Sequence, residues 1–479
     1  MAATKLTLAD VLFALTGLHA DTATQYTISD VTIDSRQCKP GALFVALPGE
    51  NTDGHTFVAQ AFAAGAIAAI TDHPVDAACT VVSAKNPHLP ADWQPPLCIQ
   101  VENSLHGLQK LAAEWRNRFS PQVIGITGSV GKTSTKELAA LVLAQKFTVL
   151  KNPGNLNNEI GLPLTLLQLN ETHRHVVLEM GMYDIGEIET LCRIARPHIG
   201  VVTNVGPSHL ERLGSLERIA AAKQELVAAL PEDGLAILNI DDPLVMKMAA
   251  HTRARVFTYG LSSEADLWAD QINSEGLEGV RFVLHHGEEA IHVKVPLLGR
   301  HSVHTALRAA AIGLSQGMHW GEIVAGLQNR NAQLRLVAIP GPHDSIILDD
   351  TYNASPESTI AALNLLHELT APRKIAVLGY MAELGSYEEA GHRKVGCRAA
   401  DTVDILIAVG RRAETVAAEA IACGLDAANV HVMPSTQAAL KFLQKITTNG
   451  DTILVKGSRS MAMETIVDGL TTMAAGGEG

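Results

Sequence analysis

The sequence is poor in basic residues compared with its acidic ones. Of its 479 residues, 37 are Lys or Arg and 50 are Asp or Glu, which gives a formal net charge of -13 at pH 7. Broad contact with nucleic acid or with an anionic membrane surface needs a basic face, so this balance argues against both partners. A few local basic side chains can still hold phosphates, so an anionic substrate stays open.

No apolar stretch is long enough to cross a membrane. The longest run of small apolar residues, 61–70, has about half the roughly 20 residues that a membrane-spanning helix needs. Residues 1–17 make a poor signal peptide, because Asp10 breaks their short apolar stretch and no clear cleavage site follows. We therefore expect a cytoplasmic protein with no integral membrane segment.

Cysteine is also scarce, and no two cysteines form a CxxC pair. The chain has six, namely Cys38, Cys79, Cys98, Cys192, Cys397 and Cys423. In a chain of this length, scattered cysteines are typical of free thiols in a reducing compartment. We therefore expect neither a disulfide framework nor a zinc site.

The pattern of apolar runs divides the chain into three segments. Residues 1–105 hold short β-like runs among Gly and Pro turns, which favours a small α/β domain. In residues 106–328, strand-like and helical runs alternate, which predicts a doubly wound, mostly parallel sheet. Residues 329–479 repeat the alternation and predict a Rossmann-like domain. The fold class is therefore α/β with three domains. The strand-like runs are 31–33, 42–47, 68–71, 123–127, 175–180, 200–205, 235–240, 345–350, 374–379, 404–410 and 452–457.

The strongest single motif is VIGITGSVGKTSTKE, residues 123–137. Here a strand-like run leads into a Gly-rich loop and then a helical segment, which lets backbone N–H groups and a helix N-terminus surround a phosphate. Lys132 is expected to reach the β- and γ-phosphates of ATP, and the Thr133 hydroxyl to bind Mg²⁺. Ile126 stands where the strict pattern G-x-x-x-x-G-K-[ST] has its first Gly, and the alternative is a turn without a ligand. The expected ATP contacts are Thr127, Gly128, Ser129, Val130, Gly131, Lys132, Thr133 and Ser134.

Polar residues follow several strand-like runs of the central segment. Glu179 comes after one run, His209 follows the next, and Asp241 comes after a third. Ligands bind outside the carboxyl ends of parallel strands, so Glu179 and His209 are candidate Mg²⁺ ligands beside Thr133. The alternative is that such residues only cap the next helix.

Other polar positions stay open from the residues alone. Asn157, Asn158 and Glu159 precede a helical stretch, where they either cap the helix or point at the γ-phosphate. Lys223 lies on an amphipathic helical stretch and, taken by itself, is typical of a solvated surface lysine.

Several motifs occur in one order: the phosphate loop, LEMG, TNVGPSHLE, AAAKQE, GRHSVHTALRAAA, LDDTYNASPEST, VLGYMAELG and KGSRSMAME. Together they closely resemble the Mur ligase family of peptidoglycan synthesis, over essentially the whole chain. The segment 30–66 is similar to the UDP-binding domain of that family. The resemblance implies an ATP-dependent amide ligase that works through an acyl-phosphate intermediate.

The resemblance also implies roles for single residues. Ser35 and Arg36 would hold the UDP part of the substrate, and His301 and Arg335 would contact ATP. Lys223 matches the lysine that the family carbamylates, which would make it an anionic ligand in a site with two Mg²⁺ ions. The implied catalytic residues are Lys132, Glu179, His209 and Lys223, and the implied metal ligands are Thr133, Glu179, His209 and Lys223. The implied substrate contacts beyond the first segment are Asn158, Glu159, Asp350, Tyr352, Asn353, Lys456, Ser458 and Arg459.

Within the family, the ending KGSRSMAME is similar to that of the members that join D-alanyl-D-alanine to UDP-N-acetylmuramoyl-tripeptide. A member that adds the third residue is expected to show a DNPR-like motif and a GKGHE-like ending, and neither occurs. The alternatives are such a third-residue-adding enzyme, a folylpolyglutamate synthase-like ligase, or a nucleotide-binding module without ligase turnover. A monomer is the working expectation.

The chain departs from the family pattern at a few positions. Ser302 and Thr305 stand where HNVxNA-like motifs have Asn, so a contact to adenine is expected to differ. Ser355 and Tyr380 replace the usual residues of the YNANP and GDMxELG motifs, which leaves the dipeptide specificity open.

Overall fold

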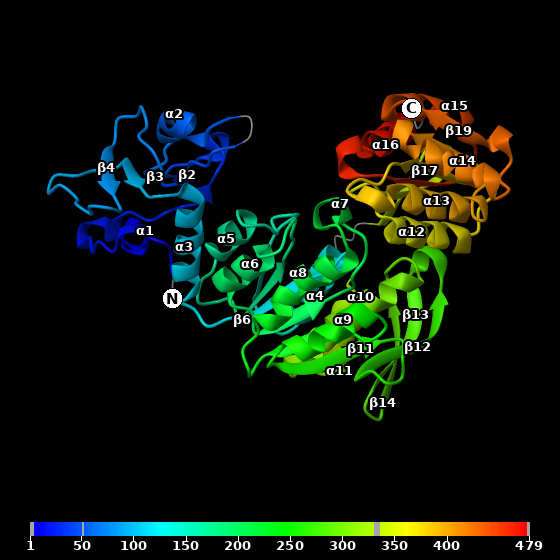
Figure 1. Cartoon of the computed structure of the whole chain (residues 1–479), viewed down its shortest axis with the longest axis horizontal. Coiled ribbons are helices and arrows are strands. Elements are labelled where there is room, and N and C mark those ends of the chain that lie inside the picture. Colours follow the sequence, from blue (N-terminus) through cyan, green and yellow to red (C-terminus); the bar gives the residue numbers. More distant parts are fainter. Residues whose placement is uncertain (1–3, 50–51, 330–335, 477–479) are drawn as a thin grey trace.

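In a computed structural model that describes residues 4–49, 52–329 and 336–476, the chain folds into three α/β domains that follow one another along the molecule (Figure 1). Their three sheets have five, nine and six strands. The three-domain, mostly parallel α/β architecture predicted from the sequence is therefore confirmed. None of the helices in the described part of the chain has both the length and the apolar composition for crossing a bilayer.

The first domain is built on an all-parallel sheet with the order β1-β2-β3-β5-β4. Its helix α1 begins where Thr7 and Asp10 form a capping box and ends at Gly17, whose φ of 75° closes the last turn. Its strands are β1 (Val31–Thr32), β2 (Leu43–Val45), β3 (Ala68–Thr71), β4 (Thr80–Ser83) and β5 (Leu97–Gln100), and its helices are α1 (Leu8–Thr16) and α2 (Val58–Ala63).

Helix α3 (Ser104–Arg116) connects the first domain to the second and lies between them in Figure 1. Its residues Leu108 and Leu111 belong to a core shared by both domains. The indole N–H of Trp115 donates to the Leu169 carbonyl at 3.0 Å, and the Arg116 side chain donates to the Ala195 carbonyl at 2.9 Å. These contacts attach the first sheet firmly to the central domain.

The central domain has a mixed sheet with the order β14-β13-β12-β11-β10-β9-β6-β8-β7. Neighbouring strands from β7 to β12 are parallel, and β13 and β14 extend the edge as antiparallel strands. The chain fills the sheet on one side of β6 with β7 and β8 and then crosses to the other side with β9. This reversal creates a crevice at the carboxyl end of β6, which is the usual ligand position in such sheets.

The central strands are β6 (Gln122–Thr127), β7 (Val149–Lys151), β8 (His175–Glu179), β9 (Ile199–Val202), β10 (Leu235–Asn239), β11 (Arg255–Gly260), β12 (Leu267–Ser274), β13 (Val280–His286) and β14 (Glu289–Val295). The helices are α4 (Lys132–Leu143), α5 (Gly161–Leu166), α6 (Glu187–Ala195), α7 (Leu210–Leu213), α8 (Leu216–Ala228), α9 (Pro243–Lys247), α10 (Val303–Ser315) and α11 (Trp320–Leu327).

The third domain has the sheet order β15-β16-β20-β17-β18-β19, in which only the edge strand β15 is antiparallel. Its strands are β15 (Val337–Pro340), β16 (Ile346–Asp350), β17 (Lys374–Gly379), β18 (Ile405–Val409), β19 (Val430–Met433) and β20 (Thr452–Lys456). Its helices are α12 (Pro356–Glu368), α13 (Glu388–Ala400), α14 (Glu414–Ala422), α15 (Thr436–Ile446) and α16 (Glu464–Gly476).

The prediction that every cysteine is a free thiol is wrong for one pair. Cys397 on α13 and Cys423 at the end of α14 form a disulfide, with Cα atoms 5.2 Å apart. The packing of α13 against α14 brings together two residues that are 26 positions apart in sequence. The free cysteines are Cys38, Cys79, Cys98 and Cys192.

Candidate functional site

The Gly-rich loop connects β6 to the N-terminus of α4, as its sequence predicts. Gly128 has a φ of 143° and Gly131 a φ of 86°, which are conformations that favour glycine. A Cβ on Gly128 would lie 1.8 Å from the Thr203 hydroxyl oxygen, so no larger residue fits there. Lys132 begins α4 and folds back over the loop, donating to the Gly128 carbonyl at 2.6 Å. The loop therefore has the geometry of a phosphate-binding turn.

Glu179, at the end of β8, is held in place beside the phosphate loop. The Thr133 hydroxyl donates to one carboxylate oxygen at 2.7 Å, and the Asn157 amide donates to the other at 2.8 Å. The Asn152 side chain also bonds the Glu179 backbone N–H and carbonyl, at 2.9 and 3.0 Å. The carboxylate is thus buried and fixed next to the hydroxyl that was predicted to bind Mg²⁺.

In the polar loop before α5, two neighbouring asparagines make different contacts. Asn158 accepts from the Gly161 N–H at 2.9 Å and caps the helix, whereas Asn157 points at Glu179. Glu159 does not line the cavity at the phosphate loop, so its expected substrate contact there has no support in this structure. The capping interpretation thus holds for Asn158, and a contact to the γ-phosphate stays a prediction for this loop.

Lys223 is buried, with 2% of its surface exposed, which overturns its reading as a solvated lysine. It lies on α8, which begins at the Ser215 cap, and its Nζ makes no hydrogen bond to any residue that the structure describes. Burial, and next the positive charge of Lys132, lower the pKa of Lys223 well below its ordinary value of 10.5. Burial therefore shifts the equilibrium of Lys223 towards the neutral amine.

One cavity of about 700 Å³ collects residues from the central and third domains. The predicted residues that line it are Thr127, Gly128, Ser129, Val130, Gly131, Lys132, Ser134, Asn158, Glu179, His209, Lys223, His301, Asp350, Tyr352, Asn353, Lys456, Ser458 and Arg459. Thr133 reaches it through its bond to Glu179. Arg335 lies outside the described residues. The strand ends, the lysine-bearing helix and the phosphate loop thus meet at a single place.

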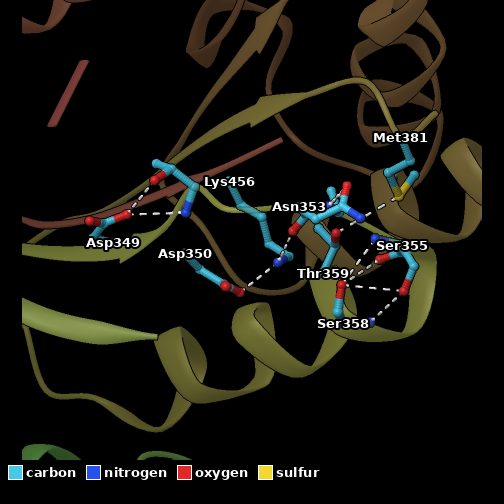
Figure 2. A network of polar contacts seen from close by, with 10 residues as sticks. Asp349, Asp350, Asn353, Ser355, Ser358, Thr359, Met381 and Lys456 are labelled. Atoms are coloured by element: carbon cyan, nitrogen blue, oxygen red, sulfur yellow. Dashed lines mark hydrogen bonds and ion pairs between the residues drawn. The ribbon is translucent and has the colours of Figure 1, made fainter. Parts of the chain in front are cut away.

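The third domain contributes a buried ion pair to this cavity. Lys456, at the end of β20, donates to the Asp350 carboxylate at 2.6 Å and to the Asn353 carbonyl at 2.8 Å (Figure 2). The Arg459 guanidinium lies over the Tyr352 ring, 5.3 Å from its centroid. Because β16 and β20 are neighbouring parallel strands, these side chains extend from the same sheet edge. Lys456 and Arg459 line the same cavity as the phosphate loop.

Ser35 and Arg36 do not line this cavity, because they belong to the first domain. The Ser35 hydroxyl donates to the Gln60 side chain at 3.2 Å. Arg36 is exposed and binds Asp34 through two hydrogen bonds of 2.9 and 2.8 Å, and this pairing lowers the pKa of Asp34 to about 2. Any substrate that touches both Arg36 and the phosphate loop must therefore extend from the first domain to the second.

Some residues of the cavity were not assigned a role from the sequence. His304, which lines the cavity, pairs with Asp241 at 2.9 Å, and the neighbouring Asp242 caps α9. Glu383 and Arg308 also line the cavity. The Thr305 hydroxyl, which stands in the usual Asn position, accepts a hydrogen bond from Arg308 at 2.9 Å. His304, Thr305, Arg308 and Glu383 lie within the motifs GRHSVHTALRAAA and VLGYMAELG, but the motifs alone do not show which of their side chains meet in the folded chain.

Three family models match successive parts of the chain. They describe the Mur ligase family catalytic domain (residues 27–116), the Mur ligase middle domain (residues 126–313) and the Mur ligase glutamate ligase domain (residues 335–459). A UDP-N-acetylmuramoyl-tripeptide–D-alanyl-D-alanine ligase of Synechocystis sp. is 37% identical over 461 residues, which cover 96% of this chain and 94% of the relative. The relative of the same name in Bacillus subtilis is 36% identical, covering 93% and 94%.

Solved structures agree with these matches. MurF from Acinetobacter baumannii has a TM-score of 0.84 at 30% identity, covering 98% of this chain and all of that one. A MurF ligase from Thermotoga maritima in complex with ADP has a TM-score of 0.78 at 28% identity, covering 93% and 98%. A folylpolyglutamate synthase of Mycobacterium tuberculosis, at 15% identity and a TM-score of 0.61, shares the fold alone.

A phosphate loop on a central parallel sheet, closed by a second Rossmann-like domain that carries basic side chains, defines an ATP-dependent ligase of three domains. The matches along almost the whole chain make the family equally clear. The chain belongs to the Mur ligase family.

Proposed function

We propose that this enzyme joins D-alanyl-D-alanine to UDP-N-acetylmuramoyl-tripeptide, with ATP as the energy source, in the synthesis of a peptidoglycan precursor. The observation that carries the proposal is the 36–37% identity, over more than nine tenths of the chain, to relatives named for this reaction. The cavity supports it, because it combines a phosphate loop, a buried lysine with a lowered pKa and basic side chains from a second domain. ATP as substrate favours a cytoplasmic location.

The chemistry follows from the poor reactivity of a carboxylate towards an amine. Transfer of the ATP γ-phosphoryl group to the tripeptide carboxylate makes an acyl phosphate. The dipeptide amine then attacks the carbonyl carbon, and phosphate leaves as the amide bond forms. The protein has to hold the reactants in line and offset their negative charges. Lys132 is placed for this task at the phosphate loop, and Lys456 and Arg459 lie across the cavity.

The residues around Glu179 fit Mg²⁺. A hydroxyl and a carboxylate meet at 2.7 Å, and His209 lines the same cavity. The buried Thr127 hydroxyl, which has no hydrogen-bond partner among the residues that the structure describes, also lines this cavity. Oxygen donors of this kind suit a hard cation. We propose that Thr133, Glu179 and His209 hold Mg²⁺, which would supply charge neutralisation at the transferred phosphoryl group.

Lys223 is proposed to carry a carbamate. Its neutral amine can attack CO₂ at carbon, forming an N–C bond and releasing one proton. The product is an anionic oxygen ligand close to Lys132 and suited to a second Mg²⁺ ion. Burial favours the required neutral form, and no acidic partner among the described residues competes for the amine.

The first and third domains are proposed to position the two substrates. Ser35 and Arg36 would bind the uridine diphosphate; Ser35 is buried, and the exposed Arg36 side chain is open to it. Asp350, Tyr352, Asn353, Ser458 and Arg459 would position the incoming dipeptide, with Lys456 fixed among them. Each predicted domain would then bind one substrate or ATP. The three domains are residues 1–105, 106–328 and 329–479.

One experiment tests the proposal directly. The purified chain is incubated with ATP, Mg²⁺, UDP-N-acetylmuramoyl-tripeptide and D-alanyl-D-alanine, and the products are weighed by mass spectrometry. We expect a product with the mass of the pentapeptide, and ADP and phosphate in equal amounts. Reactions with glutamate plus a folate, or without any amine, serve as controls. Product from the folate reaction alone, or nucleotide binding with no amine-dependent phosphate release, would refute the proposal.

A further inference from the structure

Arg308 is a buried arginine in the wall of the ligand cavity. It lies on α10 and has 3% of its surface exposed. Its guanidinium lies between the phosphate-loop helix α4 and strand β11, 5.7 Å from the centroid of the Tyr259 ring. It lines the cavity together with Gly131, Lys132 and Ser134.

Every hydrogen bond of this guanidinium within the described chain goes to a neutral hydroxyl. The acceptors are Thr135 at 2.7 Å, Thr305 at 2.9 Å and Tyr259 at 3.3 Å. No carboxylate of residues 4–49, 52–329 and 336–476 lies within ion-pair distance of it. An arginine stays charged in proteins, and a buried charge without an opposite partner is costly. The site is therefore incomplete until an anion arrives.

The surroundings add positive potential. The pKa of the neighbouring His301 is lowered to about 4, mainly by burial and then by Lys456, His304 and Arg308. The positive end of the α4 helix dipole also points here, since α4 begins at Lys132. The Arg308 charge and the N-terminus of α4 thus both add positive potential to this part of the cavity.

The position of the guanidinium indicates which phosphate group of a bound nucleotide it would contact. A Cβ on Gly131 would lie 3.0 Å from Arg308 Nη2, so this nitrogen sits directly against the phosphate loop. The guanidinium has five N–H donors, and its three bonds to hydroxyls leave two. Lys132 and Thr133, near Glu179, serve the β- and γ-phosphates. Arg308 lies beside Gly131 and Thr135, and its partner Tyr259 lies next to His304 of the Asp241–His304 pair.

We infer that Arg308 is a nucleotide-binding residue that donates to the α-phosphate of ATP and is held in place by Thr135, Thr305 and Tyr259. The inference rests on the proposed use of ATP. It also gives Thr305 a role: its hydroxyl positions the arginine that holds the nucleotide.

Calorimetry on the full chain tests the inference. ATP, ADP and AMP are titrated into the wild-type chain and into Arg308→Met, with Arg300→Met as a control for loss of an exposed arginine just before α10. We expect Arg308→Met to weaken all three nucleotides by the same factor, about tenfold to a hundredfold, because each keeps the α-phosphate. Arg300→Met should bind as the wild type does.

Other results would overturn it. Wild-type affinities in a folded Arg308→Met would assign the arginine to packing alone, and a loss confined to ATP and ADP would exclude the α-phosphate. If Arg308→Met does not fold, a crystal structure of the wild-type chain with ADP decides. A guanidinium nitrogen about 3 Å from an α-phosphate oxygen supports the inference, and one beyond about 4 Å overturns it. A wild-type chain that binds no nucleotide would refute the proposed function itself, and the inference with it.

Discussion

His209 of the central domain and Glu383 of the third domain are in direct contact, with 2.5 Å between Nδ1 and Oε2. Both residues have left-handed backbone conformations, with φ of 61° and 64°. Non-glycine residues in this region cost on the order of 1–3 kcal/mol each, and such strain often accompanies function. The Glu211 N–H also donates to the Glu383 carbonyl at 3.1 Å, so the two domains meet along the backbone as well.

The first prediction concerns this pair. A carboxylate that binds one ring nitrogen of a metal-ligating histidine fixes the direction of the other nitrogen. If His209 binds Mg²⁺ as proposed, Glu383→Ala should weaken Mg²⁺ affinity or turnover by about 10- to 100-fold. Mn²⁺ titration followed by electron paramagnetic resonance measures the affinity without turnover. Small-angle scattering should also show a more extended chain.

A matched control separates this effect from a general loss of surface charge. Glu389 is an exposed glutamate on α13 that pairs with Arg393. Glu389→Ala should leave metal affinity, turnover and scattering unchanged. Unchanged metal affinity in Glu383→Ala would mean that the pair holds the domains together without any effect on the metal.

The second prediction is that Lys223→Met inactivates the enzyme and stabilises the fold. The pKa of Lys223 is lower in the folded than in the unfolded chain, so at pH values between these two pKa values the unfolded state binds more protons, which destabilises the fold. Replacing the lysine removes this cost, which is about 1.4 kcal/mol per pKa unit. Urea unfolding in CO₂-depleted buffer should therefore show a more stable variant. The difference in unfolding free energy between the variant and the wild type should shrink as pH rises towards 10.5, because Lys223 is then deprotonated in the unfolded chain as well.

The carbamate itself needs a separate measurement. Lys223→Ala should lose most activity, and an added short-chain carboxylate should restore part of it by occupying the vacated space. A ¹³C carbamate signal should appear when the wild-type chain is placed in ¹³CO₂. Near-normal activity in Lys223→Ala would rule out the carbamate.

The third prediction concerns the buried pair of Lys456 and Asp350, whose side chains are 2% and 11% exposed. Asp350→Ala leaves Lys456 charged and buried, so it should destabilise the chain by about 3–5 kcal/mol. The double variant Asp350→Ala with Lys456→Met should recover most of this loss, because no buried charge remains. Urea unfolding of the single and double variants measures both values. Equal stability of the two variants would contradict the argument.

Continuous apolar runs made the central strands predictable. Buried parallel strands such as β6, β8 and β9 are apolar on both faces, so they stand out in the sequence, and the phosphate loop follows one of them. The strands β12 and β14 have exposed or half-exposed residues at alternate positions and produce no such run. They were missed for this reason.

The site was predictable where a local motif carries it, and not where domains meet. Glu179 and Lys132 follow strands of one sheet, so sequence and topology place them together. Glu383 reaches His209 only because the third domain lies against α7, and Lys223 is buried only because α8 packs beneath the cavity. Such contacts depend on tertiary packing, which cannot be inferred from the spacing of residues within a local sequence motif.

The last prediction tests the first domain. Arg36 is exposed and should bind the uridine diphosphate, so Arg36→Ala should raise the KM for the UDP substrate by about tenfold, the usual effect of losing a charged hydrogen bond. The KM values for ATP and D-alanyl-D-alanine should not change, because Arg36 does not line the cavity where they meet. The free energy of unfolding should not change in Arg36→Ala, because an exposed ion pair contributes little to it. Lys39→Ala removes a nearby exposed positive charge and should leave all three KM values unchanged. An equal increase in the KM for the UDP substrate in Arg36→Ala and Lys39→Ala would mean that only the overall positive charge of the first domain matters. A rise in the KM for ATP in Arg36→Ala would contradict the proposed role of Arg36.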